Sequence, residues 1–315
     1  METNKILVVF SGNIDYNTIH HTFVYEQIES VKNKYDVKFD NMLIEGKGIS
    51  GYLKNLKNLN AKIKEYKPDL IHAHFGLSGL LSNMQRAVPV VTTYHGSEIS
   101  IFTVNLLSSL SAALSGYNIY VAQHIRNRMY YKPKKNYKII PCGIDLQEFK
   151  EIDKEVSQKK MNLNKGNINI VFSGAFDNSV KNYDLANAAI RLIPDMTINL
   201  VELKSYKRSE VNYLLNACDL FLLTSKSEGS PQIIKEAMAC NCPVVATDVG
   251  DIREVISGTD GCYLTSFEPE DIALKIRDAI KFAGRTKGRE KIKNFDNNII
   301  ADKIYSVYKK VLGKK

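Results

Sequence analysis

Two glutamates, Glu228 and Glu236, lie in the part of the chain whose residue types and spacing could do the most chemistry. This part, residues 227–256, reads SEGSPQIIKEAMACNCPVVATDVGDIREVI. The turn after the first glutamate consists of Gly229, Ser230, Pro231 and Gln232. Ser230 is a favoured N-cap and Pro231 a favoured first helical residue, because proline's φ is already helical and its missing N–H is not needed there. The free N–H groups and partial positive charge of this helix start predict a phosphate site that needs no metal.

Glu236 lies five residues beyond Pro231 on the same predicted helix. At about 1.5 Å per residue, its backbone is roughly 7 to 8 Å further along the axis, which is about the span from a pyrophosphate to a ribose. Gln232, Glu236 and Cys240 share one stripe beside an apolar face, so one face can pack while the other meets a ligand. Two such glutamates without further motifs would indicate only the solvated surface of a helix.

Short apolar runs alternate with helical patterns along almost the whole chain. After the predicted helix, residues 244–247 form a predicted buried strand that leads into the turn 248–251. The other predicted strands cover 6–10, 70–71, 88–92, 119–122, 138–140, 168–172, 198–201 and 220–223. This alternation predicts an α/β fold with parallel sheets. Ligands of such sheets bind at the carboxyl ends of the strands, where the candidate residues also fall.

The motifs EG-x-P, EAMA, PVVAT and DVG follow one another in residues 228–250. In this order they resemble the donor-site signature of the retaining glycosyltransferases of family 4. The resemblance implies the GT-B fold, in which two doubly wound Rossmann-like domains face each other across a cleft. It gives Glu228 a catalytic position near the donor's sugar and phosphate, and Glu236 a hydrogen bond to the ribose hydroxyls. Through EGSPQ, KEAMACNCP and IPCG the chain resembles teichuronic-acid-type and other surface-polysaccharide enzymes of this family.

A second candidate phosphate contact follows the predicted strand 168–172. Gly174 lets the backbone approach a phosphate, and Lys181 just downstream can neutralise it. The family has a glycine and a lysine at matching places, so the resemblance implies donor-phosphate roles for both. Ala175 departs from the family's pattern, which usually has an arginine there, and the strength of pyrophosphate binding is left open.

Histidines and a glycine in the first half are further candidates. His95 follows the predicted strand 88–92 in a segment that resembles the family's T-x-H-G, whose histidine approaches the sugar near its anomeric carbon. The resemblance therefore implies a catalytic role for His95. We expect His72 and His74, in IHAHFG, to be structural or to contact the acceptor. Gly12, in the loop after the first strand, is expected near the transferred sugar.

The length of 315 residues suits two domains of about 150 residues each. The polar interval 148–167 predicts a linker, so we expect an N-terminal acceptor-side domain over 1–150 and a nucleotide-sugar-binding domain over 151–296. Residues 297–315 predict a helix that, by resemblance, crosses back to the first domain. No apolar run approaches the roughly 20 residues that cross a bilayer, and the first strand is too short for a signal-peptide core. These features predict a cytoplasmic protein.

The formal charge of +9 predicts an anionic partner. One basic cluster contains Lys54, Lys57, Lys62, Lys64 and Lys67, and another contains Arg126, Arg128, Lys132, Lys134, Lys135 and Lys138 among Tyr130, Tyr131 and Tyr137. Lysine with tyrosine suits peripheral contact with an anionic membrane or a phosphate-bearing lipid acceptor, and a merely solvated basic face is the alternative.

The five cysteines lack the spacing of a disulfide framework and predict reduced thiols. Pairing Cys240 and Cys242 with His72 and His74 as a zinc site matches no standard spacing, so we expect neither a metal site nor a cofactor.

The leading prediction is a metal-independent glycosyltransferase that moves a sugar from a nucleotide-diphosphate donor, UDP before GDP, to a glycan or lipid-linked acceptor. The chain has no D-x-D metal motif at a strand end. An epimerase or hydrolase on the same fold is one alternative. The other is a non-catalytic nucleotide- or nucleic-acid-binding module, although nucleic acid is not expected as a partner.

Overall fold

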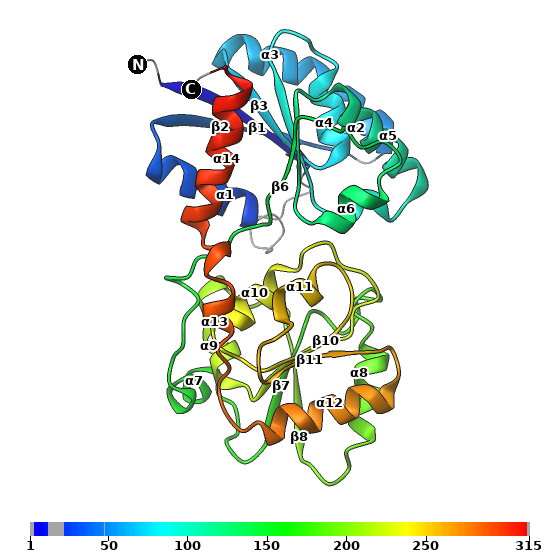
Figure 1. The fold of residues 1–315 in the computed structure, drawn as a ribbon, viewed down its shortest axis with the longest axis vertical. Coiled ribbons are helices and arrows are strands. Elements are labelled where there is room, and N and C mark those ends of the chain that lie inside the picture. Colours follow the sequence, from blue (N-terminus) through cyan, green and yellow to red (C-terminus); the bar gives the residue numbers. More distant parts are fainter. Residues whose placement is uncertain (1–2, 12–21, 47, 314–315) are drawn as a thin grey trace. The chain divides into compact units, whose positions relative to one another are not determined.

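The computed structural model describes residues 3–11, 22–46 and 48–313 of the chain. Two compact units are formed, the first by Met1–Gly143 with Asn297–Lys315 and the second by Ile144–Asp296 (Figure 1). Each unit is built on one parallel sheet with helices on both faces. This confirms the predicted α/β class with two Rossmann-like domains.

The sheet of the first unit has the strand order β2-β1-β3-β4-β5-β6. Its strands are β1 (Asn4–Ser11), β2 (Val37–Ile44), β3 (Leu70–His74), β4 (Val90–Tyr94), β5 (Tyr117–Tyr120) and β6 (Tyr137–Ile139). The central strands β3, β4 and β5 are buried along their whole length. Continuous apolar runs such as those predicted from the sequence therefore become strands covered on both faces.

Helices cover both faces of this sheet. They are α1 (Thr22–Lys34), α2 (Gly48–Lys54), α3 (Leu56–Tyr66), α4 (Gly76–Asn83), α5 (Phe102–Leu114), α6 (Gln123–Arg128) and α14 (Asn297–Val311), with a 3₁₀ turn at Ser97–Ile99. Helices α1 and α14 lie side by side, where the Tyr35 ring stacks on Tyr305 at 3.7 Å and the Tyr35 hydroxyl donates to Asp302. The last helix of the chain thus belongs to the first unit, within which it packs on one face of the sheet.

The sheet of the second unit has the order β11-β10-β9-β7-β8. Its strands are β7 (Ile168–Phe172), β8 (Ile198–Glu202), β9 (Leu220–Leu223), β10 (Val244–Thr247) and β11 (Cys262–Thr265). Its helices are α7 (Lys154–Met161), α8 (Tyr183–Arg191), α9 (Arg208–Ala217), α10 (Gln232–Ala239), α11 (Ile252–Ile256), α12 (Pro269–Lys281) and α13 (Gly288–Lys291), with a 3₁₀ turn at Lys293–Phe295. Helices α9, α10 and α11 cover one face, and α8 and α12 cover the other.

Three elements differ from the expectations. The strands β2 and β11 were missed, because β2 carries Lys38, Asp40 and Asn41 among its apolar residues and β11 has only four residues. The polar interval expected to be a linker contains helix α7, which Asp153 caps by accepting the N–H of Val156 at 2.9 Å. The first of the two segments that form the first unit runs to Gly143.

In both units the strand order reverses beside the first strand of the unit. The sheet runs to one side from β1 and to the other from β3, and the same reversal occurs between β7 and β9. Ligands of doubly wound sheets bind at this switch point, outside the carboxyl ends of the strands. The loops after β7 and β9 are therefore the first place to look for a site in the second unit.

Candidate functional site

The predicted donor residues of the second unit follow the two strands of the switch point. Gly174 comes two residues after β7, and Glu228 comes five residues after β9. The hydroxyl of Thr224, at the end of β9, donates to the carbonyls of Lys181 and Asn182, both at 3.0 Å. The loop after β7 is thereby fastened to the end of β9.

Lys181 and Glu228 form an ion pair, with 2.7 Å between Nζ and Oε1. Both side chains are largely buried, at 20% and 15% exposure. The stem of Lys181 crosses Gly174 so closely that a Cβ there would lie 2.9 Å from Cγ of the lysine. A side chain at this position would push the lysine away, so the glycine sets the path by which the ammonium reaches the carboxylate.

The start of α10 differs from the prediction in one respect. The helix begins at Gln232, and Pro231 rather than Ser230 is the N-cap residue. The Ser230 hydroxyl instead donates to Asp251 at 2.6 Å and accepts from the ammonium of Lys235 at 2.8 Å. Lys235 is fully buried, and a buried ammonium needs such partners, which explains why Ser230 turns away from the helix end.

The helix start carries no side-chain cap among the residues that the structure describes. The N–H groups of its first turn are the donors that a helix leaves without intrahelical partners, and they carry the partial positive charge of the helix dipole. A phosphate is the ligand that such a terminus accommodates.

Gly250 fixes the loop that carries Glu228. Its φ is +67°, and a Cβ there would lie 2.7 Å from the carbonyl oxygen of Gly229 and 3.1 Å from that of Glu228. Neither the backbone angle nor this approach tolerates a side chain well. The DVG turn is thus the support on which the glutamate loop rests, a role that the sequence did not assign to it.

Glu236 lies on α10 with only 3% exposure. Its Oε1 accepts a hydrogen bond from Arg208, whose guanidinium also lies 4.4 Å from the centroid of the Phe149 ring. Burial raises the pKa of Glu236, and the charge of Arg208 acts in the opposite direction. Arg208 opens α9, far from α10 in sequence, and was not predicted as a site residue.

Cys240 does not belong to a ligand-facing stripe. It is buried in the core of the second unit, where its thiol donates to Asn212 at 3.1 Å. Gln232 is half-buried and Glu236 is 3% exposed, whereas Cys240 has no exposure, so the predicted ligand-facing stripe does not extend to the last turn of α10. Helix α10 packs on α9, and this contact encloses the side chain of Cys240. All five cysteines are free thiols.

His95 follows β4 in the first unit. Its Nε2 lies 3.0 Å from Nδ1 of His74, and the two rings are stacked with centroids 5.2 Å apart. The carboxylate of Glu98 accepts the backbone N–H groups of Gly76 at 3.3 Å, of His95 at 3.1 Å and of Gly96 at 2.7 Å. Burial raises the pKa of Glu98, while these three donors favour its charged form. The turn that presents His95 is therefore tied to a buried acceptor.

His72 is a structural residue. It is fully buried, and its ring nitrogens lie 2.7 Å from the hydroxyl of Tyr308 and 2.8 Å from that of Thr93. Burial lowers its pKa to about 3, so the ring is neutral at physiological pH. Gly12, expected near the transferred sugar, lies outside the described residues.

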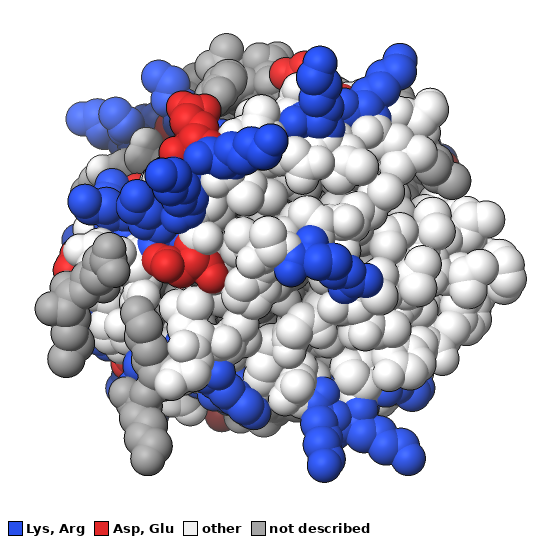
Figure 2. Space-filling model, turned by 90° about the horizontal axis from the view of Figure 1, so that it is seen from above, with Lys and Arg blue, Asp and Glu red and all other residues white. Residues whose placement is uncertain are grey.

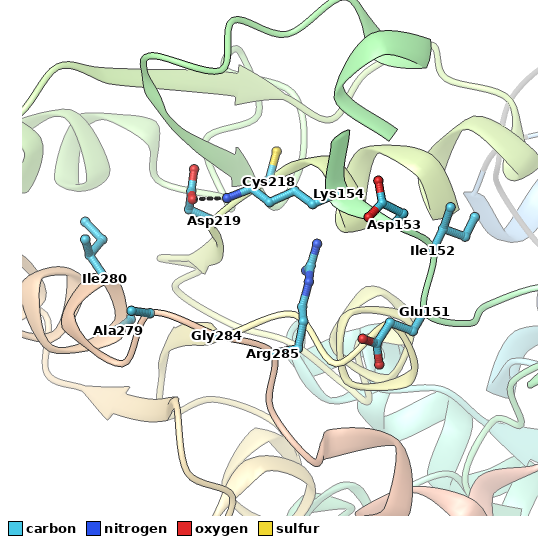
Figure 3. A pocket seen from close by; sticks show the side chains of 11 residues that line it. Glu151, Ile152, Asp153, Lys154, Cys218, Asp219, Ala279, Ile280, Gly284 and Arg285 are labelled. Carbon is cyan, nitrogen blue, oxygen red and sulfur yellow. Dashed lines mark hydrogen bonds and ion pairs between the residues drawn. The ribbon is translucent and has the colours of Figure 1, made fainter. Parts of the chain in front are cut away.

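A cavity of about 550 Å³ lies in the second unit on the side of the amino ends of the strands, away from the predicted donor residues (Figure 3). It is lined by Glu151, Ile152, Asp153, Lys154, Cys218, Asp219, Ala279, Ile280, Ala283, Gly284 and Arg285. Asp219 comes just before β9, so the cavity faces the amino ends of the strands, and Lys154 points across it to this carboxylate. None of the predicted donor residues lines it, and two of its charged side chains, Lys154 and Asp219, form an ion pair with each other.

Among the residues that the structure describes, no helix has both the length and the apolar character needed to cross a bilayer.

Comparison with curated proteins gives relatives that are described as glycosyltransferases. An uncharacterized glycosyltransferase of Methanocaldococcus jannaschii is 28% identical over 296 residues, which cover 82% of this chain and 79% of that protein. The putative teichuronic acid biosynthesis glycosyltransferase TuaC of Bacillus subtilis is 27% identical, with 65% of this chain and 58% of TuaC covered. An N,N'-diacetylbacillosaminyl-diphospho-undecaprenol alpha-1,3-N-acetylgalactosaminyltransferase of Campylobacter jejuni is 27% identical, with coverages of 67% and 65%. The chain thus spans less than two thirds of the length of the last two.

Solved structures with the same fold include sucrose-phosphate synthase of Thermosynechococcus elongatus, with a TM-score of 0.82, 16% identity and coverage of 98% of this chain and 99% of that one. HepE of Anabaena in complex with UDP gives a TM-score of 0.74 at 17% identity, covering 97% and 100%. At such identities the likeness establishes the fold, which in these neighbours is GT-B.

Two family models match the chain in succession. The model described as Glycosyltransferase Family 4 matches residues 28–148, and the model described as Glycosyl transferases group 1 matches residues 195–281. The first match covers most of the sheet that carries His95, and the second covers the strands and helix that position Glu228 and Glu236. The chain thus carries a Glycosyltransferase Family 4 domain followed by a Glycosyl transferases group 1 domain, on the GT-B fold of its structural neighbours.

Proposed function

We propose that this glycosyltransferase moves a sugar from a nucleotide-diphosphate donor, UDP before GDP, to a hydroxyl of a lipid-linked glycan, with retention of the anomeric configuration and without a metal ion. The observation that carries the proposal is the ion pair of Lys181 and Glu228 over Gly174, beside the uncapped start of α10. One ammonium, one carboxylate and the start of a helix follow the switch-point strands β7 and β9 of this sheet. A diphosphate attached to a sugar needs groups of these three kinds.

The donor would lie along α10. Its phosphates would accept N–H bonds from the turn of Gly229, Ser230, Pro231 and Gln232, where proline offers no donor, and a hydrogen bond from Lys181. Glu236, deeper on the same helix, would accept bonds from the ribose hydroxyls. Arg208 holds this carboxylate in place and favours its charged form, which is the better acceptor.

The transfer step would follow a front-face course. The bond between the anomeric carbon and the diphosphate oxygen breaks, and the acceptor oxygen bonds to the same face of that carbon. The departing phosphate takes the proton of the acceptor hydroxyl, so atoms and charge balance without a protein base. Lys181 and the helix start stabilise the developing negative charge, while Glu228 and His95 stabilise the positive sugar.

The nature of donor and acceptor draws support from related proteins. The Campylobacter relative is named for an acceptor linked through diphosphate to undecaprenol, and TuaC for teichuronic acid biosynthesis. HepE, which shares the fold, has been solved with UDP and with UDP-glucose. We extend these substrate classes to this chain as part of the proposal, together with peripheral contact with an anionic membrane.

Thermal melting in EDTA tests the donor site, because a ligand that binds only the folded state raises the melting temperature. UDP, GDP, CMP and ADP, each with their common sugar conjugates, would be compared. We expect a shift that depends on the base and that disappears in Glu236→Ala and Lys181→Met. Lys281→Met, at an exposed lysine that ends α12, is the matched control and should respond as the parent does.

Product analysis then separates transfer from the alternatives. With the donor sugar named by the melts, a transferase gives a new glycoside only when a lipid-linked acceptor is present. Free sugar without acceptor would indicate a hydrolase, and an isomerised nucleotide sugar an epimerase. No shift with any nucleotide would remove the donor site itself and leave a non-catalytic module.

A further inference from the structure

The outward face of helix α5 is apolar. Phe102, Leu106 and Leu110 recur every four residues on one stripe and are 67%, 52% and 49% exposed. The buried residues of the helix are Asn105, Ser108, Ser109, Ser111 and Ala112. This is the reverse of the usual surface helix, which turns its apolar stripe to the core.

Close helix packing explains the inward residues of α5. Gly76 and Gly79 of α4 approach this helix so closely that a Cβ at these positions would lie 2.0 Å from Oγ of Ser108 and 2.4 Å from Oγ of Ser111. Only small side chains fit between the two helices. Among the residues that the structure describes, nothing covers the outward side chains, and a partner outside the unit would account for their apolar character.

The apolar surface continues beyond α5 on both sides. The Tyr130 ring lies 5.4 Å from that of Phe102, and the N–H of Tyr131 donates to Ser109. On the other side, Leu107 lines an apolar groove with Leu53 and Met84. The residues that we call the α5 surface are Leu53, Met84, Ile101, Phe102, Leu106, Leu110, Tyr130 and Tyr131, all of them about half exposed or more.

The charged residues that neighbour most of the α5 surface in sequence are basic, with one exception. Between Asp69 and Asp145 the sequence has a single carboxylate, Glu98, and this one is buried under backbone N–H groups. The same interval contains Arg86, Arg126, Arg128, Lys132, Lys134, Lys135 and Lys138. Figure 2 shows a broad, mostly uncharged face on the side where Figure 1 has α2, α4 and α5, with lysines and arginines at its margins and some basic atoms within it.

We propose that the α5 surface docks on an anionic lipid bilayer. Apolar side chains would enter the boundary between headgroups and acyl chains, and the basic margin would attract the anionic headgroups. Helix α5 has 13 residues and is therefore about 20 Å long, shorter than the roughly 30 Å of hydrocarbon, so it would lie along the surface. A second copy of the chain fits less well, because a symmetric contact would bring two sets of the exposed cations Lys132, Lys134 and Lys135 together.

The docking extends the proposed function, since a lipid-linked acceptor lies at such a bilayer, but its test needs neither donor nor acceptor. The full chain would be sedimented with vesicles of phosphatidylcholine and phosphatidylglycerol, and with vesicles of phosphatidylcholine alone. One variant carries Phe102→Ser with Leu106→Ser, and its control carries Leu274→Ser, at a 53% exposed leucine of α12. A second variant carries Lys134→Gln with Lys135→Gln, and its control carries Lys159→Gln with Lys281→Gln at exposed lysines of the second unit.

We expect binding only to the vesicles with phosphatidylglycerol, weaker at high salt. The serine variant should bind at least about tenfold more weakly, and the glutamine variant about fivefold more weakly for each lysine removed. Both controls should bind as the parent does, and the melting response to nucleotides should be unchanged in all variants.

Absence of vesicle binding by the parent, or equal binding by the serine variant, would overturn the proposal. So would dimerisation in light scattering that the serine variant abolishes, because the surface would then be a protein contact. A protein that docks on vesicles yet shows no response to nucleotides would remove the proposed donor site and leave the docking standing.

Discussion

Gly174→Ala should weaken donor binding through Lys181 while leaving the fold intact. The backbone at this position does not have a positive φ, so alanine adds no backbone strain. The new methyl would lie 2.9, 3.2 and 3.3 Å from Cγ, Cε and Cδ of Lys181. Ordinary carbon contacts are about 3.5 to 4.0 Å, and a stem that is too close at three atoms cannot relieve them by a small rotation. The lysine must take another rotamer, which removes its ammonium from Glu228.

The size of the effect follows from the bond that is lost. A hydrogen bond from a charged group contributes about 1.5 to 3 kcal/mol, which is about 10-fold to 150-fold in a dissociation constant. We expect UDP affinity to fall within this range. The free energy of unfolding should change by less than about 1 kcal/mol, because a partly exposed lysine can find another position.

Titration calorimetry with UDP and melting curves without ligand would measure the two quantities. Gly284→Ala is the matched control, since its new methyl would meet no atom closer than 3.8 Å. Lys181→Met removes the ammonium and keeps most of the stem. If the alanine acts through Lys181, the double variant should bind UDP no more weakly than Lys181→Met alone. Additive losses, or unchanged affinity in Gly174→Ala, would show that the glycine does not work through this lysine.

Other buried groups give three further predictions. Glu236→Gln should weaken UDP binding about tenfold or more by calorimetry, since the amide is a poorer acceptor for ribose and for Arg208, and equal affinity would contradict the ribose role. His72, with its pKa lowered to about 3, binds fewer protons folded than unfolded below pH 6.5, so the fold should lose about 2 kcal/mol between pH 7 and pH 5. Denaturant titrations should show this loss in the parent and not in His72→Gln. Glu98→Gln should lower the free energy of unfolding by about 2 to 3 kcal/mol, because an amide N–H₂ would face backbone donors, and should slow transfer by displacing His95.

The sequence predicted those features that depend on local pattern. The strands β7, β9 and β10 have the predicted bounds because each is a continuous apolar run between polar turns. The positions of Gly174, Lys181 and Glu228 followed from the family motifs, and the structure brings all three together.

Contacts between distant elements could not be predicted in the same way. Arg208 reaches Glu236 from another helix, and Lys235 reaches Asp251 through Ser230. The predicted N-cap role of Ser230 was wrong because such a contact between distant elements engages its hydroxyl. The local rule expects the Ser230 hydroxyl to accept a hydrogen bond from the helix N–H groups. In the structure the hydroxyl bonds to the Lys235 ammonium and the Asp251 carboxylate instead. A buried charge without a partner costs more free energy than a helix end without a side-chain cap.

The three described cations of the proposed donor site each face a carboxylate, directly or through Ser230. Lys181 pairs with Glu228, Arg208 with Glu236, and Lys235 with Asp251 through Ser230. Arg208 also lies 3.9 Å from Glu148, so these cations leave no net positive charge, and the negative diphosphate would have to be held chiefly by the helix start and by a share of the Lys181 ammonium.

This charge balance makes Ala175 a useful position for a test, because the family pattern that the chain resembles has an arginine there. Ala175→Arg would place an additional cation beside Gly174, at a position that is half-buried and follows the switch-point strand β7. One charge-assisted hydrogen bond to a phosphate should tighten UDP binding about tenfold or more, and the gain should shrink as salt is added. Ala175→Gln, of similar length and without charge, is the control and should bind UDP as the parent does. If the arginine gains nothing at low salt, either the diphosphate does not lie over the loop after β7 or the helix start already holds it fully. Phosphate titration of the parent separates these two outcomes, because a site held by the helix start alone also binds inorganic phosphate.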